Sequence, residues 1–503
     1  MFERKATQQL LAWKNGRNRQ TVLLLEGAQR VGKRTLAQEF GRRHYKSTLT
    51  IDFASISDDL KSLFLELRTD IQRLYQYFSA IYNVPLHPKE SLLLFCNVQH
   101  FPLARAFVKH IAADASFDCI ETGSLLSIKQ NIDGILIPSE EESLRLHPLD
   151  FEEFLCALDE RTFVDILKDT YASLRPLPDA LHKKAMRLVR EYMLVGGMPH
   201  VVDIFSQRHS FAEADSEKRQ IFDLYRKDVG RFARGYQDKV MSIFDEIPAQ
   251  LSTHEKRFKL SALSENARMR SYEEAFFWLT DAQITNPCFA ASDSSVSLSL
   301  SRSQSSVKCY MADTGLLCAL ALANGATTAE ELYRNVLLGN VAINEGMLVE
   351  NFVAQTLASK GDKLFFYAQT SSKKGCERME VDFLIVRPFA DEGGKPRVVP
   401  IEVKSGNKYR TTSLDRFSQK FASKVGTEVV LHPGQLRKEG KRLFVPLYLA
   451  HLIWDQMPDS CGDAPKSKRQ GPVGKQADSA IGRGKARKVP VRDNCRVRGN
   501  TPR

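Results

Sequence analysis

The residues with the clearest chemical potential form a glycine-containing loop near the start of the chain. Gly27 and Gly32 stand five positions apart, and Lys33 follows directly. Glycines so placed let successive backbone N–H groups turn toward one anion, while the lysine ammonium reaches the β- and γ-phosphates. The candidate phosphate-binding residues are Gly27, Ala28, Gln29, Arg30, Val31, Gly32, Lys33, Arg34 and Thr35. The alternative is a glycine-containing turn that binds no ligand.

The residue after Lys33 departs from the pattern of a magnesium-dependent loop. That position normally holds a serine or threonine whose hydroxyl binds Mg²⁺, whereas this chain has Arg34. Thr35 comes one residue later, about 100° around a helix from the required face. The sequence therefore predicts binding of a nucleotide such as ATP, and it weakens the case for hydrolysis assisted by Mg²⁺ as cofactor.

A second departure follows an apolar segment at residues 92–95. In P-loop ATPases the corresponding strand ends in Asp-Glu, and these carboxylates support Mg²⁺ and the attacking water. Here the two residues are Cys96 and Asn97, and neither is a carboxylate. Both departures remove parts of the same magnesium machinery, so we predict nucleotide binding without efficient turnover.

A second set of chemically competent residues lies toward the C-terminal end. Glu402 and Lys404 are two residues apart, so a strand would place both on one face. Asp382, in a preceding alternating segment, is a candidate partner of Glu402 in holding Mg²⁺, and Glu350 on a predicted helix would complete the site. Such a metal activates water against a phosphodiester, and Lys404 would orient that water. The alternative is an exposed, charged strand end.

The elements that position the first set alternate between strands and helices. Apolar runs predict strands at residues 21–25, 48–53, 91–99 and 117–121, and helical periodicity predicts helices at 1–20, 36–40 and 58–83. This alternation, with a phosphate loop after the first strand, favours a parallel α/β sheet. The last strand ends at Thr122, Gly123 and Ser124, where a polar side chain would contact a γ-phosphate or cap a helix.

The middle of the chain is predicted to be helical from residue 147 to about residue 235, with a Gly/Pro turn at 195–199. In residues 236–300 three short helices precede a strand, which is typical of a winged-helix module. Such modules bind DNA or mediate protein contacts. The serine-rich residues 292–306 are expected to form a linker or a wing.

Composition limits the class of protein. The chain has 503 residues, of which 43% are hydrophobic and 26% charged, so we expect three or four globular domains. No apolar run is long enough to span a membrane, and the first residues lack a secretory apolar region. The nine cysteines include no Cys-x-x-Cys pair, so neither a zinc site nor a disulfide framework is indicated. These features predict a cytoplasmic protein without a membrane partner.

Positive charge is concentrated in residues 456–503. This tail holds twelve Lys/Arg against four Asp/Glu and so supplies +8 of the net charge of +12. Its scarcity of apolar residues predicts disorder. A basic arm can bind a nucleic acid such as DNA without sequence preference, and a solvated extension without a partner is the alternative.

Taken together, the motifs resemble bacterial and archaeal AAA-type P-loop ATPases of the AAA_14 class joined to a C-terminal DUF4143 region. The resemblance covers roughly residues 1–450 and depends on segments 27–36, 122–124, 147–155, 196–199, 225–229, 310–317 and 402–406. It implies a nucleotide-binding core (1–155), a helical lid (156–235), a winged-helix-like module (236–308) and an α/β nuclease-like domain (309–455) before the tail (456–503). The Glu350, Asp382, Glu402 and Lys404 set is similar to the PD-(D/E)xK nuclease fold, with Asp382 and Glu402 as metal ligands.

Two functional hypotheses follow from these observations. In the first, the protein is an ATP-binding, nucleic-acid-associated enzyme with weak ATPase activity, a metal-dependent nuclease, or both. In the second, it is a non-hydrolysing, nucleotide-responsive scaffold or interaction module. The sequence leaves open the natural substrate, the partner, the oligomeric state and the source of an arginine finger.

Overall fold

The computed structural model describes residues 2–16, 21–67, 70–127, 139–253, 255–265, 267–294, 297–322, 329–339, 344–369, 378–389 and 395–453. The chain divides into two units, Met1–Ser460 and Cys461–Arg503. All described residues belong to the first unit. The prediction of a disordered basic tail at 456–503 lies outside the described residues.

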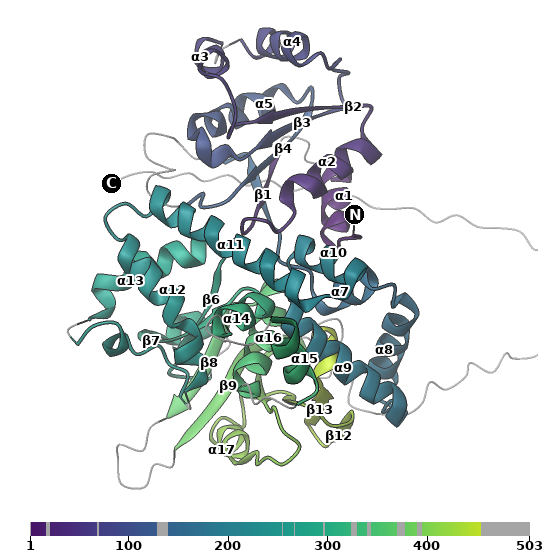
Figure 1. Cartoon of the computed structure of the whole chain (residues 1–503), viewed down its shortest axis with the longest axis vertical. Coiled ribbons are helices and arrows are strands. Elements are labelled where there is room, and N and C mark those ends of the chain that lie inside the picture. The colour runs from purple at the N-terminus through teal and green to yellow at the C-terminus, as the bar shows by residue number, and fades with distance from the viewer. Residues whose placement is uncertain are drawn as a thin grey trace, which may run out of the picture. The chain divides into compact units, whose positions relative to one another are not determined.

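The first sheet contains five parallel strands in the order β2-β3-β4-β1-β5 (Figure 1). The strands are β1 (Val22–Glu26), β2 (Ser47–Asp52), β3 (Ser91–Cys96), β4 (Asp118–Gly123) and β5 (Glu141–Arg145). β3 is buried along its whole length, as its apolar run predicts. The predicted parallel α/β sheet is confirmed. Because β1 lies between β4 and β5, the strand order reverses there, and ligands of such sheets bind at the carboxyl ends beside that reversal.

The helices of this region follow the predicted alternation, with one difference. They are α1 (Ala6–Asn15), α2 (Lys33–His44), α3 (Asp58–Glu66), α4 (Ile71–Tyr82) and α5 (Val108–Asp114), with the short 3₁₀ turns η1 (Val98–His100) and η2 (Pro102–Phe107). The helical stretch predicted at 58–83 is two helices. The Asp70 carboxylate accepts a hydrogen bond of 3.1 Å from the backbone N–H of Arg73 and caps a new helix start.

A helical region follows the first sheet. It comprises α7 (Phe151–Ala157), α8 (Arg161–Ser173), α9 (Asp179–Val195), α10 (Pro199–Arg208), α11 (Phe211–Phe232), α12 (Gln237–Ser252), η3 (Leu260–Ala262) and α13 (Met269–Asp281). α7 begins with a reciprocal capping box, in which Asp150 accepts from the backbone N–H of Glu153 and Glu153 accepts from that of Asp150. The predicted Gly/Pro turn separates α9 from α10.

The second sheet is mixed and has eight strands in the order β12-β13-β11-β10-β9-β8-β6-β7. The strands are β6 (Thr285–Ala291), β7 (Arg302–Met311), β8 (Leu364–Gln369), β9 (Met379–Phe389), β10 (Lys395–Val403), β11 (Glu428–His432), β12 (Arg437–Glu439) and β13 (Arg442–Pro446). The associated helices are α14 (Thr314–Ala321), α15 (Ala329–Leu337), α16 (Glu345–Ser359) and α17 (Thr412–Lys420), with the 3₁₀ turns η4 (Leu298–Ser301) and η6 (Leu447–Leu452).

The hairpin of β6 and β7 contains the strand expected in the winged-helix-like module. β6 also pairs in parallel with β8, so the hairpin forms one end of the second sheet. β7 continues past the predicted module boundary at residue 308 to Met311. The winged-helix and nuclease-like assignments, and the predicted module boundaries, stay predictions.

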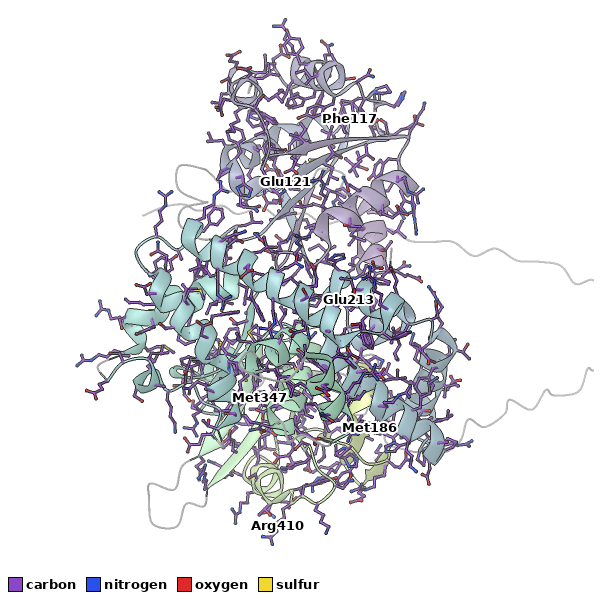
Figure 2. The ribbon with its side chains drawn as sticks, in the orientation of Figure 1. Phe117, Glu121, Met186, Glu213, Met347 and Arg410 are labelled. Carbon is purple, nitrogen blue, oxygen red and sulfur yellow. The ribbon has the colours of Figure 1, made fainter. Side chains whose placement is uncertain are left out.

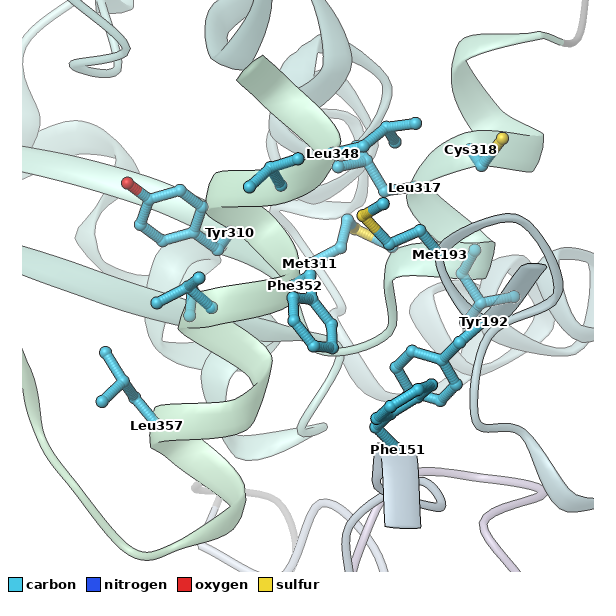
Figure 3. Close-up of a cluster of buried hydrophobic side chains, with 14 of the residues drawn as sticks. Phe151, Tyr192, Met193, Tyr310, Met311, Leu317, Cys318, Leu348, Phe352 and Leu357 are labelled. Atoms are coloured by element: carbon cyan, nitrogen blue, oxygen red, sulfur yellow. The ribbon is translucent and has the colours of Figure 1, made fainter. Parts of the chain in front are cut away.

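One hydrophobic core joins the helical region to the second sheet (Figure 3). The ring centroids of Phe151 and Tyr192 lie 5.7 Å apart, and those of Tyr192 and Phe352 lie 5.8 Å apart. Met311 and Leu317 belong to the same cluster. The strands of the first sheet are instead packed within two clusters of their own.

A carboxylate is buried within the first sheet. Glu121 of β4 (Figure 2) is fully buried, and it interacts with the ion pair between Arg105 and Glu141, whose Nη2 and Oε1 atoms are 2.7 Å apart. Burial, followed by the charge of Glu141, raises the pKa of Glu121 to about 8. Glu121 is therefore largely protonated at neutral pH, and it brings no full negative charge to the nearby strand ends.

Among the described residues, no helix combines the length and the apolar composition needed to cross a bilayer.

Candidate functional site

The predicted phosphate-binding loop connects β1 to α2, as the motif requires. Gly32, the residue before α2, has a left-handed φ of 95°, which favours glycine. A Cβ on Gly27 would lie 2.6 Å from the carbonyl oxygen of Leu146, so a side chain there would collide with backbone. The loop thus needs both glycines. It ends at the N-terminus of α2, where unpaired N–H groups favour an anion.

Lys33 lies against the loop itself. Its Nζ donates hydrogen bonds to the carbonyl oxygens of Gly27 (2.8 Å) and Ala28 (2.9 Å). Burial lowers the pKa of Lys33 to about 8, while the carboxylates of Asp228 and Glu26 act in the opposite direction. The ammonium is therefore held by two neutral carbonyl oxygens. An anionic phosphate is a stronger hydrogen-bond acceptor than either of them.

A cavity of about 750 Å³ opens at the loop and reaches the carboxyl ends of β3 and β4. Its size is typical of a small-molecule site. Four cationic side chains line it, Arg4, Arg30, Lys33 and Arg34, against one carboxylate, that of Asp203. Two of these cations are already paired with carboxylates, Arg4 with Glu153 and Arg34 with Asp52, and the remaining balance favours an anionic ligand.

Of the nine predicted loop residues, six line the cavity and three do not. The cavity is lined by Gln29, Arg30, Gly32, Lys33, Arg34 and Thr35. Gly27 and Ala28 instead supply the carbonyl groups that hold Lys33. Val31 is fully buried in the core against α2, and its carbonyl oxygen accepts a hydrogen bond from Arg4. The loop therefore lies at the cavity, and the role of its residues in binding a ligand stays a prediction.

The polar residues predicted after β4 also reach this cavity. Thr122 and Ser124 both line it. The Thr122 hydroxyl accepts a hydrogen bond of 3.4 Å from the backbone N–H of Asn97, and the Ser124 N–H donates to Oε1 of Gln99 at 3.4 Å. These bonds tie the ends of β3 and β4 together beside the loop.

The two departures from the magnesium pattern meet at a residue that the sequence analysis did not single out. Arg34 donates from Nη1 to Oδ2 of Asp52 at 2.7 Å, and Asn97 donates from Nδ2 to Oδ1 of the same carboxylate at 2.8 Å. Asp52 is the last residue of β2, which lies beside β3. Cys96 is fully buried, and burial raises the pKa of its thiol to about 11, so it brings no charge.

Asp228 and Arg4 also contact the loop, and both are missing from the sequence prediction. Gln29 donates from Nε2 to Oδ2 of Asp228 on α11. Burial raises the pKa of Asp228 to about 6, and the charges of Arg231 and Lys33 oppose that shift. Arg4 donates to the carbonyl oxygens of Val31 (3.2 Å) and His147 (2.6 Å). The only sequence signal for Asp228 was its place in the motif at residues 225–229.

Several motifs of the family resemblance meet at one packing contact. The N–H of Leu149 donates to the carbonyl oxygen of Gly197 at 2.7 Å, and the N–H of Gly197 donates to Oδ2 of Asp313 at 2.6 Å. The next helix, α10, starts at Pro199, which lines the cavity. These motifs therefore position the cavity wall and do not supply its chemistry.

The second predicted set comes together on β9, β10 and α16. β9 and β10 are antiparallel, with Phe383 opposite Ile401. The carboxylate of Asp382 accepts a hydrogen bond of 2.8 Å from the N–H of Val403. Nζ of Lys404 lies 2.6 Å from Oε1 of Glu402. Asp382, Glu402 and Lys404 therefore lie together at the end of β10, and their role as one site stays a prediction.

Two lysines that the sequence analysis did not assign complete this cluster. Nζ of Lys308, which is 1% exposed, lies 3.2 Å from Oε1 of Glu350 and 2.9 Å from Oε1 of Glu380. Lys256 forms an ion pair with the other oxygen of Glu350, and the Tyr310 hydroxyl donates to Oε1 of Glu350. Glu350 is therefore already compensated by protein cations.

The three carboxylates that the sequence analysis predicted in this cluster differ in charge state. Burial, followed by the charge of Asp382, raises the pKa of Glu402 to about 8. Burial and the charge of Glu350 raise the pKa of Asp382 to about 6. Burial would also raise the pKa of Glu350, but Lys308 and Lys256 outweigh it and lower that pKa to about 2. Glu402 lies in an environment that disfavours its charged form, and its buried Oε2 has no hydrogen-bond partner among the described residues.

The fit of this cluster to a metal ion is mixed. Carboxylate oxygens are the ligands that Mg²⁺ prefers, and Oε2 of Glu402 lacks a partner. Lys308, however, places a cation among the same carboxylates. Across the described residues, no group of three or more His, Cys, Asp or Glu side chains has the arrangement of a metal site.

Comparisons with protein families agree with part of the sequence analysis. Residues 19–155 match an AAA domain of the AAA_14 class, and residues 345–450 match DUF4143, a domain of unknown function. Residues 186–327 match a further domain of unknown function, DUF8612, which the sequence analysis did not anticipate. The matches support the expected AAA-type P-loop domain with a DUF4143 region. No curated protein matches the chain.

Two solved structures are similar to parts of the chain. The Walker-type ATPase PABY2304 of Pyrococcus abyssi is 14% identical with a TM-score of 0.38, and the match covers 64% of this chain and 96% of that one. C. elegans PCH-2 is 12% identical with a TM-score of 0.22, and the match covers 41% of this chain and 58% of that one.

Proposed function

We propose that this protein binds a nucleoside triphosphate such as ATP at residues 27–35 and hydrolyses it inefficiently. The observation that carries the proposal is the convergence of Lys33 and three arginines on one cavity at the N-terminus of α2. Backbone N–H groups at a helix start and lysine and arginine side chains are the groups that bind phosphates elsewhere. The AAA-type match over residues 19–155 supports the same ligand class.

Inefficient hydrolysis is proposed from the residues beside the cavity. The position of the metal-binding hydroxyl is occupied by Arg34, and β3 ends in a neutral buried thiol followed by the amide of Asn97. Loss of one preorganised catalytic group commonly lowers a rate about 10²–10³-fold. A nucleotide-responsive binding protein is therefore favoured over a fast ATPase.

Thermal unfolding of the full chain with and without ATP tests the proposal. A ligand that binds only the folded state raises the melting temperature. We expect ATP to raise it for the wild-type protein and for Lys61→Ala, at a partly exposed lysine on α3, and not for Lys33→Ala. The absence of any ATP effect on the wild-type protein would contradict nucleotide binding. Rapid Mg²⁺-dependent hydrolysis that disappears in Lys33→Ala would contradict only the proposal of inefficient turnover.

A second candidate function, favoured by the juxtaposition of Asp382, Glu402 and Lys404, is metal-dependent cleavage of DNA. When bound, Mg²⁺ or Mn²⁺ would supply a cation that activates water. Asp382 and Glu402 would hold it, and Lys404 would orient the water or the phosphate.

The candidate nuclease function is tested by measuring Mn²⁺ binding and DNA nicking separately. Asp382→Ala and Glu402→Ala should each remove both properties, whereas Lys404→Ala should remove nicking and retain Mn²⁺ binding. Removal of residues 456–503 should weaken DNA association and reduce its salt dependence, because the tail carries the excess positive charge. Glu439→Ala, at an exposed ion pair on β12, is the control. Unchanged Mn²⁺ binding in Asp382→Ala and Glu402→Ala would leave the cluster as an ion-pair network.

A further inference from the structure

Arg34 and Asp52 form an ion pair beside the phosphate-binding loop, where a magnesium ion would be expected. Arg34 occupies the sequence position of the Mg²⁺-binding hydroxyl, and Asn97 follows the strand end that normally carries the supporting carboxylates. Their side chains bind opposite oxygens of one carboxylate, that of Asp52. Arg34 and Asn97 are 63 positions apart in the sequence, and both bind the same carboxylate, that of Asp52.

The Asp52 carboxylate accepts three hydrogen bonds in this arrangement. Oδ2 accepts from Arg34 at 2.7 Å, while Oδ1 accepts from the Asn97 amide at 2.8 Å and from the backbone N–H of Ala54 at 3.1 Å. A divalent ion at this carboxylate would have to displace a charge-assisted bond. Mg²⁺ also dehydrates reluctantly and requires near-octahedral oxygen ligands. The residues at the expected magnesium position therefore do not fit that ion.

Arg34 can instead meet phosphate oxygens directly. Its side chain is half exposed and lines the cavity next to Lys33, and only one of its terminal nitrogens is given to Asp52. A guanidinium has five N–H donors in a planar fork, which matches phosphate geometry. Pairing with Asp52 fixes the head group while leaving other donors available.

We infer that the Arg34 guanidinium, held by Asp52, which Asn97 also binds, replaces the magnesium ion, and that the ligand of the cavity is a metal-free nucleoside polyphosphate. The inference depends on the proposed nucleotide-binding function and specifies the form of its ligand. Arg34 is then a binding residue that neutralises phosphate charge, and bound nucleotide is retained when divalent metal is removed.

The experiment measures ATP affinity of the full chain by titration calorimetry, once with excess EDTA and once with Mg²⁺. We expect the wild-type protein to bind ATP in EDTA at least as tightly as in Mg²⁺. Arg34→Thr restores the hydroxyl and frees Asp52. It should weaken binding in EDTA by about tenfold or more, equivalent to about 1.4 kcal/mol, and Mg²⁺ should restore part of the affinity.

Arg42→Thr is the matched control. It makes the same change on the same helix, where Arg42 forms an exposed ion pair with Glu39 and does not line the cavity. This variant should retain wild-type affinity in both buffers. Arg34→Lys keeps the charge but loses the fork, so its affinity in EDTA should lie between those of wild type and Arg34→Thr.

The outcomes separate the inference from the proposed function. Wild-type binding that requires Mg²⁺, or Arg34→Thr binding in EDTA equal to wild type, would overturn the role of Arg34 while leaving nucleotide binding intact. No binding by the wild-type protein in either buffer would overturn the proposed function, and with it the inference. Circular dichroism of each variant without nucleotide checks that the fold is retained.

Discussion

The backbone N–H of Gly197 and Oδ2 of Asp313 are joined by a hydrogen bond of 2.6 Å, although the two residues are 116 positions apart in the sequence. Asp313 is 1% exposed and also caps α14 by accepting from the N–H of Leu316 at 2.9 Å. One carboxylate therefore connects the turn that begins α10 beside the cavity at Lys33 to the helix that follows β7.

Replacement of Asp313 by alanine should destabilise the protein strongly. It leaves two buried N–H groups without acceptors, each costing about 1–3 kcal/mol, so we expect a loss of at least about 2 kcal/mol in the free energy of unfolding. Asp70→Ala is the control, because Asp70 is an exposed helix cap without a long-range partner among its described hydrogen bonds, worth about 1 kcal/mol. Urea unfolding of both variants measures the difference. Equal losses would contradict the cross-linking role of Asp313.

Gly315→Ala tests the close packing between α14 and the turn after α9, and Gly230→Ala in α11 is its control. A Cβ on Gly315 would lie 2.3 Å from the carbonyl oxygen of Val195, whereas nothing lies within 4 Å of a Cβ on Gly230 inside α11. Gly315→Ala should therefore destabilise by several kcal/mol or prevent folding. Gly230→Ala should be stabilising by about 0.5–1 kcal/mol, because alanine favours a helix interior over glycine. Thermal unfolding measures both, and a tolerated Gly315→Ala would contradict the packing.

Nucleotide affinity should depend on pH through Lys33. Its pKa of about 8 in the free protein means that the ammonium predominates below pH 8 and the neutral amine above it. Phosphate favours the ammonium, so affinity should fall by up to about tenfold per pH unit above pH 8, with uptake of one proton on binding. Calorimetry in buffers of different ionisation enthalpy measures this uptake. Lys33→Arg remains charged, so any binding it retains should not show this pH dependence.

The stability of the free protein should change with pH in the opposite direction. Between pH 8 and the unfolded value of 10.5, the unfolded state binds more protons at Lys33 than the folded state does. The contribution of Lys33 to unfolding free energy therefore rises with pH across that window. A difference between wild type and Lys33→Met that is flat from pH 8 to pH 10 would contradict the lowered pKa.

Removal of the Lys308 ammonium should cost more than removal of a surface lysine. Lys308→Met leaves buried Glu350 and partly buried Glu380 with less compensating charge, and breaking a buried ion pair costs about 3–5 kcal/mol. Lys61→Met removes an exposed pair with Asp58 and should cost less than about 1 kcal/mol. Urea unfolding compares them. If Asp382 and Glu402 hold a divalent ion, Lys308→Met should also increase Mn²⁺ affinity, because a competing cation is gone.

Local patterns in the sequence were sufficient to locate the loop at residues 27–35, the parallel sheet and the Asp382, Glu402 and Lys404 group. Glycine spacing, apolar runs and period-two alternation depend on neighbouring residues, and burial acts on them directly. The same reasoning predicted one helix at 58–83, because apolar periodicity alone does not register the cap supplied by Asp70.

The partners of the functional side chains were decided by the tertiary structure. The sequence identified Arg34 and Asn97 as departures, but the parallel pairing of β2 and β3 brought Asp52 between them. Similarly, only packing placed Asp228 beside Gln29 and Lys308 beside Glu350. Residue type and spacing determine which chemistry is available. Charge compensation depends on distances between segments far apart in the chain, and those distances are set by packing of the buried core.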